Sequence, residues 1–237
     1  MIVGEKNMRR KFGLVVAMLA CFLFLTAGAF ADVLTPGSGT GSPDVFSSLG
    51  AGTIVAQATD SYTMSTSGTG TLYTAVYKVT ATGYLDFLYQ VSVTSGDANE
   101  LVVANFFPAI WGGVSPSADV GYLNITNPNT VVGAPFQAVT VNHGPPSGVN
   151  WPGPAGTPNI NFEDLNGGYA VLPGQTSYVE VIETQNTNYS AGLAAVEDNL
   201  NSGNLAAFEP VPEPASIALF GSGLLGLVGF ARRRFLK

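Results

Sequence analysis

The sequence contains one cysteine, Cys21, and one histidine, His143. Cys21 lies in an apolar segment near the N-terminus. The apolar run continues beyond it, which favours a filler residue over a lipoprotein signal. Removal of that segment leaves no cysteine, so a disulfide framework and thiolate catalysis are excluded. A single histidine excludes His-His metal sites and pairs of histidines.

Positive charge is nearly absent from the middle of the chain. Of the nine Lys and Arg residues, only Lys78 lies between residues 32 and 209, whereas all acids except Glu5 and Glu213 do, so this stretch has a net charge of −13. Such a field repels phosphates, which excludes nucleic acid and anionic lipid as partners. The other cations flank two apolar runs: Lys6, Arg9, Arg10 and Lys11 before the first, and Arg232, Arg233, Arg234 and Lys237 after the second.

Motifs for catalysis are also missing. No G-x-S-x-G segment occurs, so a Ser-His-Asp site has no nucleophile elbow, and His143 is expected to be a turn residue at a strand end. Paired carboxylates for glycoside cleavage remain open, because their separation depends on the fold. Glu180 and Glu183 fall on opposite faces of a strand and are not such a pair. We therefore predict no enzyme, no metal site and no cofactor.

The N-terminal 31 residues have the pattern of a signal peptide. A basic start leads into the apolar run FGLVVAMLACFLFLTAGAF, and Ala29 and Ala31 supply small residues at positions −3 and −1. Signal peptidase would then cleave before Asp32. The alternative is an uncleaved membrane anchor.

A second apolar run, residues 215–231, contains no charged residue. As a helix it would be about 25 Å long, at the short end of what crosses a bilayer. The arginines that follow it are expected to stay cytoplasmic, which leaves Pro212, Glu213 and Pro214 at the outer face in an extended, accessible segment. The GSGLLG segment at residues 221–226 spells a dinucleotide-binding fingerprint, but it lacks the strand and βαβ unit that this motif requires.

The order of these features in the C-terminal tail, residues 210–237, resembles the PEP-CTERM sorting signal of exported bacterial proteins. It implies that Pro212, Glu213 and Pro214 are the sorting motif, that residues 215–231 are a transmembrane helix and that Arg232, Arg233 and Arg234 are the basic stop. It also implies an exosortase-type sorting enzyme as partner, contact with the membrane, and an association with exopolysaccharide. Similar tails are sometimes labelled after ice-binding proteins, but a sorting tag does not confer that activity.

The central region alternates with a period of two. After a Gly-, Ser- and Pro-rich lead-in at residues 32–52, the segment GYLDFLYQVSVT places Leu85, Phe87 and Tyr89 on one face and Asp86 and Gln90 on the other, which predicts a half-buried strand. The preceding TLYTAVYKVTA joins it through Gly83 as a hairpin. Further strands are expected at 101–107, 120–126, 137–141, 168–172 and 177–184, with a closing hairpin around 199–203, although 193–200 would also fit a short helix. This predicts an antiparallel β-sandwich, jelly-roll or Ig-like, at residues 53–209.

A long loop at residues 142–168 interrupts the strands, and its prolines predict no regular structure there. Trp151 offers a flat platform for a sugar ring; the alternative is a tryptophan that pins the loop to the sandwich. Trp111 is expected in the core. Oxygen ligands of the kind that calcium uses also gather in the loop, but the EF-hand spacing is missing, so a solvated loop is favoured. These ligands are Asn159, Asn161, Glu163, Asp164 and Asn166.

The sequence thus predicts an exported, non-catalytic β-sandwich of the cell surface or extracellular matrix. A carbohydrate-binding module that uses an aromatic loop is the main alternative. A glycan hydrolase and an ice-binding protein follow, the latter disfavoured because no regular Thr-x-Thr array recurs.

Overall fold

The computed structural model describes residues 33–34, 41–64, 68–104, 106, 110–111, 115–116, 118–151, 159–198 and 204–211. The predicted signal peptide with Ala29 and Ala31, the sorting motif, the apolar segment 215–231 and the C-terminal arginines lie outside these residues. Among the described residues, no helix is long and apolar enough to span a membrane.

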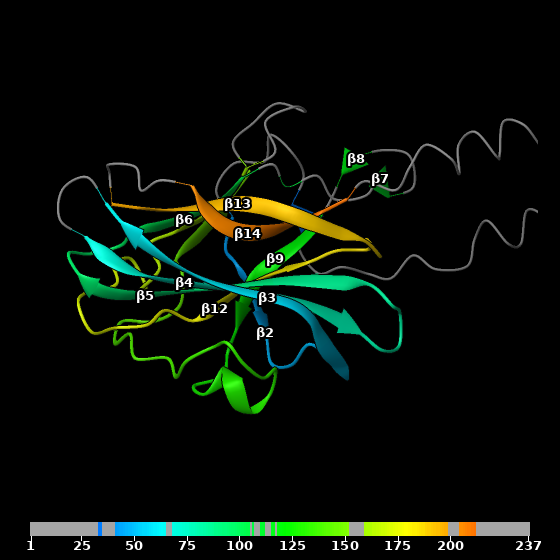
Figure 1. Cartoon of the computed structure of the whole chain (residues 1–237), viewed down its shortest axis with the longest axis horizontal. Helices are drawn as coiled ribbons and strands as arrows, with labels where there is room; N and C mark the ends of the chain where they lie inside the picture. Colours follow the sequence, from blue (N-terminus) through cyan, green and yellow to red (C-terminus); the bar gives the residue numbers. More distant parts are fainter. Residues whose placement is uncertain are drawn as a thin grey trace, which may run out of the picture. The chain divides into compact units, whose positions relative to one another are not determined.

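The larger of the two main sheets has seven strands. Its order is β1-β9-β12-β5-β4-β3, with β2 paired to β9, and all pairs are antiparallel except β2–β9. Figure 1 shows its long strands crossing the middle of the described region. The strands are β1 (Val33–Leu34), β2 (Asp44–Phe46), β3 (Gly52–Thr63), β4 (Thr69–Val79), β5 (Leu85–Ser95), β9 (Ala118–Leu123) and β12 (Val179–Glu183).

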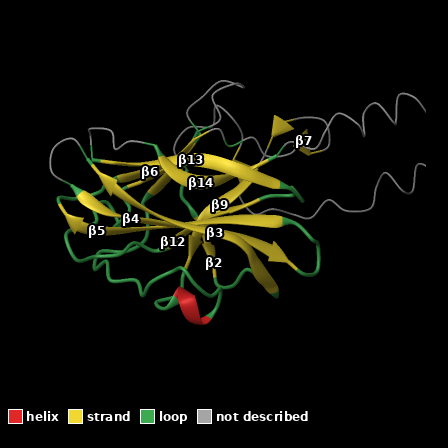
Figure 2. Cartoon of the chain, in the orientation of Figure 1, coloured by secondary structure: helices red, strands yellow, loops and turns green. Residues whose placement is uncertain are grey.

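The smaller main sheet has five antiparallel strands in the order β10-β11-β6-β13-β14. They are β6 (Glu100–Ala104), β10 (Gly148–Asn150), β11 (Ile160–Glu163), β13 (Tyr189–Glu197) and β14 (Leu205–Pro210). A separate short pair joins β7 (Ile110–Trp111) and β8 (Ser115–Pro116), and a 3-10 turn, η1, spans Pro128–Thr130. Figure 2 shows the described region as strands and loops with this one short helical turn.

The predicted hairpin of residues 73–93 is confirmed as β4 and β5. Lys78 pairs with Leu85 at its closed end, and Gly83 takes the positive φ of 74° that the turn requires. The Gly83 amide donates to the Val79 carbonyl at 2.8 Å. Turn chemistry and alternation therefore specify this pair locally.

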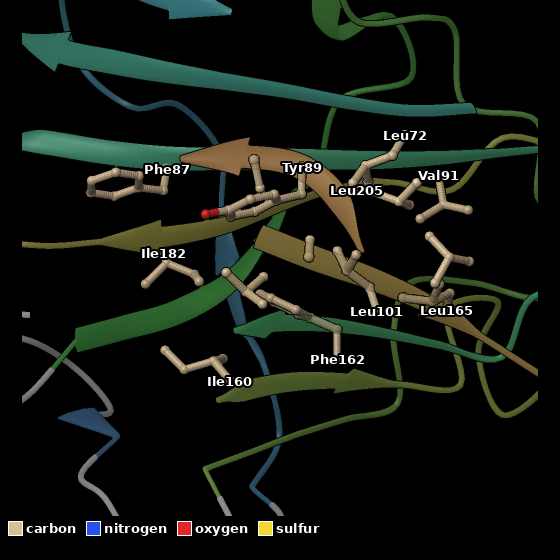
Figure 3. Close-up of a cluster of buried hydrophobic side chains, with 14 of the residues drawn as sticks. Leu72, Phe87, Tyr89, Val91, Leu101, Ile160, Phe162, Leu165, Ile182 and Leu205 are labelled. Atoms are coloured by element: carbon tan, nitrogen blue, oxygen red, sulfur yellow. The ribbon is translucent and has the colours of Figure 1, made fainter. Parts of the chain in front are cut away.

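Between the two sheets lies one apolar core. It receives the inward side chains of β5, β6, β11 and β13, among them Phe87, Leu101, Phe162 and Val196. Figure 3 shows side chains of both sheets meeting there. Phe87 packs edge-to-face on Phe106 with ring centroids 5.2 Å apart. The predicted all-β class, with two antiparallel-dominated sheets, is confirmed.

The opposite face of the larger sheet is also covered. Leu49 and the segment after β9, with Val132 and Phe136, pack over Leu88 and Val181 to form a second core; this segment, which contains η1, lies below the sheet in Figure 1. As a result Asp86 and Gln90, on the supposedly exposed face of β5, are 3% and 0% exposed. The prediction that β5 is half-buried is wrong, because a segment remote in sequence covers its polar face.

Most of the other strand predictions are confirmed with shifted ends: 101–107 is β6, 120–126 is β9 and 177–184 is β12. The closing hairpin exists as β13 and β14, so the helical alternative is wrong. The strand predictions at 137–141 and 168–172 are wrong. Their backbone bonds are isolated: the Thr140 amide donates to the Thr176 carbonyl at 3.0 Å, and Val171 forms a single antiparallel bridge with Ala98.

Two regions expected to be irregular contribute strands. The predicted lead-in supplies β1 and β2, which pair with β9. The long loop contains β10 and β11, and β10 fits between Pro146 and Pro152. Proline has no amide hydrogen to donate in a sheet, but both prolines lie outside the three residues of β10. They therefore do not prevent this short strand from pairing.

Candidate functional site

Trp151 does not provide a surface platform. It follows β10 directly, is 1% exposed and belongs to the core between the sheets. Neither face of its ring is available to a sugar, so the platform expectation is wrong at this residue. Its position fits the alternative expectation, a tryptophan that fastens the loop. The side chain of Trp111 is not among those that the structure describes.

Polar side chains of the oxygen-rich segment 159–166 bond to other parts of the chain. Asn166 is fully buried, where its Oδ1 accepts from the His143 amide at 2.9 Å and its Nδ2 donates to the Ala170 carbonyl at 3.0 Å. Glu163 accepts from the Asn150 amide side chain, and Asp164 accepts from the Ser147 hydroxyl at 2.8 Å. Among the described residues, no three His, Cys, Asp or Glu side chains are placed to hold a metal ion.

His143 and Tyr169 form an exposed aromatic pair. Their ring centroids are 4.2 Å apart and the rings are inclined by 31°. Tyr169 is 59% exposed, a large fraction for a tyrosine held by a neighbour. We call the surface formed by residues 142–147 and 164–175 the aromatic corner. His143 lies in a bend, but the strand at 137–141 that it was expected to end is absent, and sequence reasoning missed its partner Tyr169.

The aromatic corner is held rigidly from beneath. Besides binding the two backbone groups above, Asn166 donates its own amide to the Tyr169 carbonyl at 3.1 Å, and the Gly167 amide donates to the Pro145 carbonyl at 2.8 Å. Gly167 has a φ of 61°, and a Cβ there would lie 2.6 Å from the His143 carbonyl oxygen. Only glycine permits this approach of the two loops.

Amide side chains lie beside the aromatic pair. Gln175 donates to the Asn142 side-chain oxygen at 3.3 Å and accepts from the Leu172 amide at 2.9 Å. Asn142 is exposed, and Leu172 is 46% exposed. Flat aromatic faces with nearby amides suit the apolar faces and hydroxyl groups of sugars. The only local sequence signal was a tyrosine within a Gly-Gly-Tyr segment, and its contact with His143 arises from the fold.

A row of carboxylates crosses the outer face of the larger sheet. Asp86, Glu183 and Asp119 lie opposite one another on β5, β12 and β9. Burial, followed by the charges of Glu183 and Asp119, raises the pKa of Asp86 to about 8. Burial and Asp44 also raise the pKa of Glu183. With Asp86 and Asp119 nearly inaccessible, this row is unsuited to binding a substrate.

Glu180 is the carboxylate on the inner face of β12. It is fully buried, and that burial raises its pKa well above the ordinary value. The Ser177 hydroxyl lies 3.4 Å from Glu180 Oε2. Glu180 and Glu183 thus face opposite sides of the strand, as predicted, and a neutral Glu180 is the form that this environment stabilises.

A second row of acids lies on the smaller sheet. Glu100 on β6 pairs directly with Glu197 on β13, and Glu163 follows the Phe162–Leu101 pair on β11. Burial, followed by Glu197 and then Glu163, raises the pKa of Glu100. All three are half-buried. Glu100 therefore lies among carboxylates at a partly exposed position on the smaller sheet.

The comparison with protein families identifies the tail. Residues 210–234 match the family model of the PEP-CTERM protein-sorting motif. This match contains the predicted motif Pro212, Glu213 and Pro214, the apolar segment and the three arginines. No curated protein and no solved structure matches the chain.

Proposed function

Because the chain carries the PEP-CTERM sorting signal of exosortase substrates, we propose that it is an exported, non-catalytic β-sandwich that binds extracellular polysaccharide through the aromatic corner. The signal implies export and sorting to the cell envelope or surface. Its partners during export are signal peptidase, the secretion machinery and the exosortase. The protein contacts the membrane at least during sorting.

The exposed Tyr169, stacked on His143 and fixed by the buried Asn166, carries this proposal. A binding platform that is already ordered loses little conformational entropy when a ligand binds. The sequence predicted Trp151 as the aromatic residue of a binding loop. In the structure Tyr169, from the same loop region, is the aromatic residue that is exposed.

The negative charge of the protein favours one class of polysaccharide over another. The stretch 32–209 has a net charge of −13 and a single lysine. An acidic polysaccharide would be repelled, since like charges raise the cost of association. The partner is therefore a neutral polysaccharide, recognised by ring stacking and by hydrogen bonds from Asn142 and Gln175.

Affinity electrophoresis through gels that contain a neutral glucan, galactan or mannan tests this proposal. At least one gel should retard the wild-type protein, and Tyr169→Ala should lower its affinity about tenfold, which corresponds to about 1.4 kcal/mol. Tyr189→Ala is the matched control, because Tyr189 is 38% exposed on β13. Equal retardation of both variants, or none of the wild type, contradicts the proposal.

A glycan hydrolase is the second candidate, favoured by the row Glu163, Glu100 and Glu197. A carboxyl with a raised pKa beside other carboxylates is the arrangement of a general acid and its partner. Release of new reducing ends from the same three polysaccharides would support this candidate if Glu100→Gln abolished it. Unchanged polysaccharide after prolonged incubation excludes this activity on them.

A further inference from the structure

The folded domain holds the chain up to the residue before the sorting motif. The Val211 amide donates to the Asn188 carbonyl at 3.1 Å, and the Val211 carbonyl accepts from Asn186 Nδ2 at 3.0 Å. Both backbone groups of Val211 are therefore bound. Pro212, the first residue of the motif, follows directly in the sequence.

Asn186 is itself anchored to the larger sheet. It is fully buried in the connection between β12 and β13, where its carbonyl accepts from the Leu85 amide at 2.9 Å. The Thr184 hydroxyl accepts from the Asn186 amide at 3.2 Å and donates to the Leu85 carbonyl at 2.7 Å. Hydrogen bonds therefore connect Val211, through Asn186, to Leu85, the first residue of β5, which is far from the tail in sequence.

The residues before Val211 are held as well. Pro210 ends β14 and pairs with Tyr189, and the Phe208 carbonyl accepts from the Tyr89 hydroxyl at 2.9 Å. The match to the sorting motif begins at Pro210. The signal and the folded domain therefore overlap, and no linker separates them.

We propose that Asn186 restrains processing of the sorting tail by keeping Val211 in the fold. Processing enzymes bind peptides as extended, accessible segments, and a residue whose amide and carbonyl are both bound is not accessible in this way. The upstream side of the motif enters the exosortase only when the end of β14 opens. The rate of processing then follows the population of that open state.

Pulse-chase labelling of the full-length precursor, in cells that contain its sorting enzyme, measures this rate as loss of the tail. Asn186→Ala should accelerate processing about fivefold, the effect expected from loss of one net hydrogen bond. Asn188→Ala is the matched control, because its exposed side chain bonds to Thr187 rather than to Val211 and its backbone carbonyl is unchanged. It should process at the wild-type rate.

Insertion of a six-residue Gly-Ser spacer between Val211 and Pro212 separates restraint from general destabilisation. The spacer leaves the Asn186 contact intact and should accelerate processing by at least the same factor, with no further gain when Asn186→Ala is added. The proposal is overturned if the spacer has no effect, or if Asn186→Ala accelerates processing equally in the spacer background. Tyr169→Ala should process normally, so this test is independent of polysaccharide binding.

Discussion

Around β5 and β12, the two faces of the larger sheet are both buried, but by different means. The inner face meets another sheet, and its side chains are apolar apart from a few residues such as Glu180. The outer face meets irregular segments, and there Leu88 and Val181 lie beside Gln90 and the carboxylates of Asp86, Asp119 and Glu183.

The difference follows from where the covering segments find hydrogen-bond partners for their backbone amides and carbonyls. Strands of a covering sheet bond to one another and need only apolar contact from below. An irregular cover leaves amides and carbonyls that the sheet has to bind. Gln90 does so by donating to the Gln137 and Ser177 carbonyls and accepting from the Gln137 amide, and the Tyr77 hydroxyl donates to the Gly50 carbonyl. Polar residues on the outer face therefore serve the fold.

The largest effect is expected on the inner face. Phe87→Ala removes a fully buried ring that packs on Phe106, and should lower the free energy of unfolding by about 3–5 kcal/mol. Urea denaturation followed by tryptophan fluorescence measures it. Val45→Ala, at a residue that is 58% exposed, should change it by less than about 0.5 kcal/mol. Similar losses in the two variants would contradict the described core.

A smaller loss is expected where Gln90 binds the cover. Gln90→Leu keeps the volume but leaves the Gln137 amide and carbonyl without their side-chain partner, which should cost about 2 kcal/mol. Hydrogen exchange should show faster exchange at Gln137 and its neighbours, while the inner strands remain protected. Uniform acceleration over both sheets would show that the outer cover is not a separate unit.

The carboxylate row should make the free energy of unfolding fall as the pH rises. Acids whose pKa is lowered by folding have the opposite effect. Among the described residues, the titratable groups that act on this row from the packed elements are Tyr77, Glu183, Asp119 and Asp44. Between pH 4 and 8 folded Asp86 keeps its proton while the unfolded chain releases it, so stability is greatest below about pH 4 and falls as the pH rises toward 8.

Asp86→Asn tests that sign. The variant should gain about 1–3 kcal/mol over the wild type at pH 8 and little at pH 4, because the amide carries no charge to desolvate. Thermal unfolding across this range measures the difference. Val45→Ala, which removes no ionisable group, should leave the slope unchanged. A wild-type protein that becomes more stable as the pH rises would contradict the burial of this row.

The smallest effect on stability is expected at the aromatic corner. Tyr169→Ala removes an exposed ring and should change the free energy of unfolding by less than about 0.5 kcal/mol. Gly167→Ala, in contrast, forces a Cβ toward the His143 carbonyl and should cost about 1–3 kcal/mol. Equal melting temperatures for these two variants would show that Asn166 and Gly167 do not hold the corner.

Local patterns were sufficient where neighbours in sequence are neighbours in space. The β4–β5 hairpin, the all-β class and the sorting tail all follow from alternation, turn residues and the order of a short motif. Residues 137–141 and 168–172 alternate too, yet they are not strands, because alternation does not supply a partner strand.

Sequence alone determined the address of this protein, since a charge pattern, an apolar run and Pro212, Glu213 and Pro214 are meaningful without a fold. It did not determine which surfaces are free. Trp151 is in the core and Tyr169 is exposed, Asp86 is buried under a distant segment, and Asn186 holds the residue before the motif. Burial depends on segments far apart in the chain, so only the packed structure distinguishes a ring or carboxylate that supports the fold from one available to a ligand.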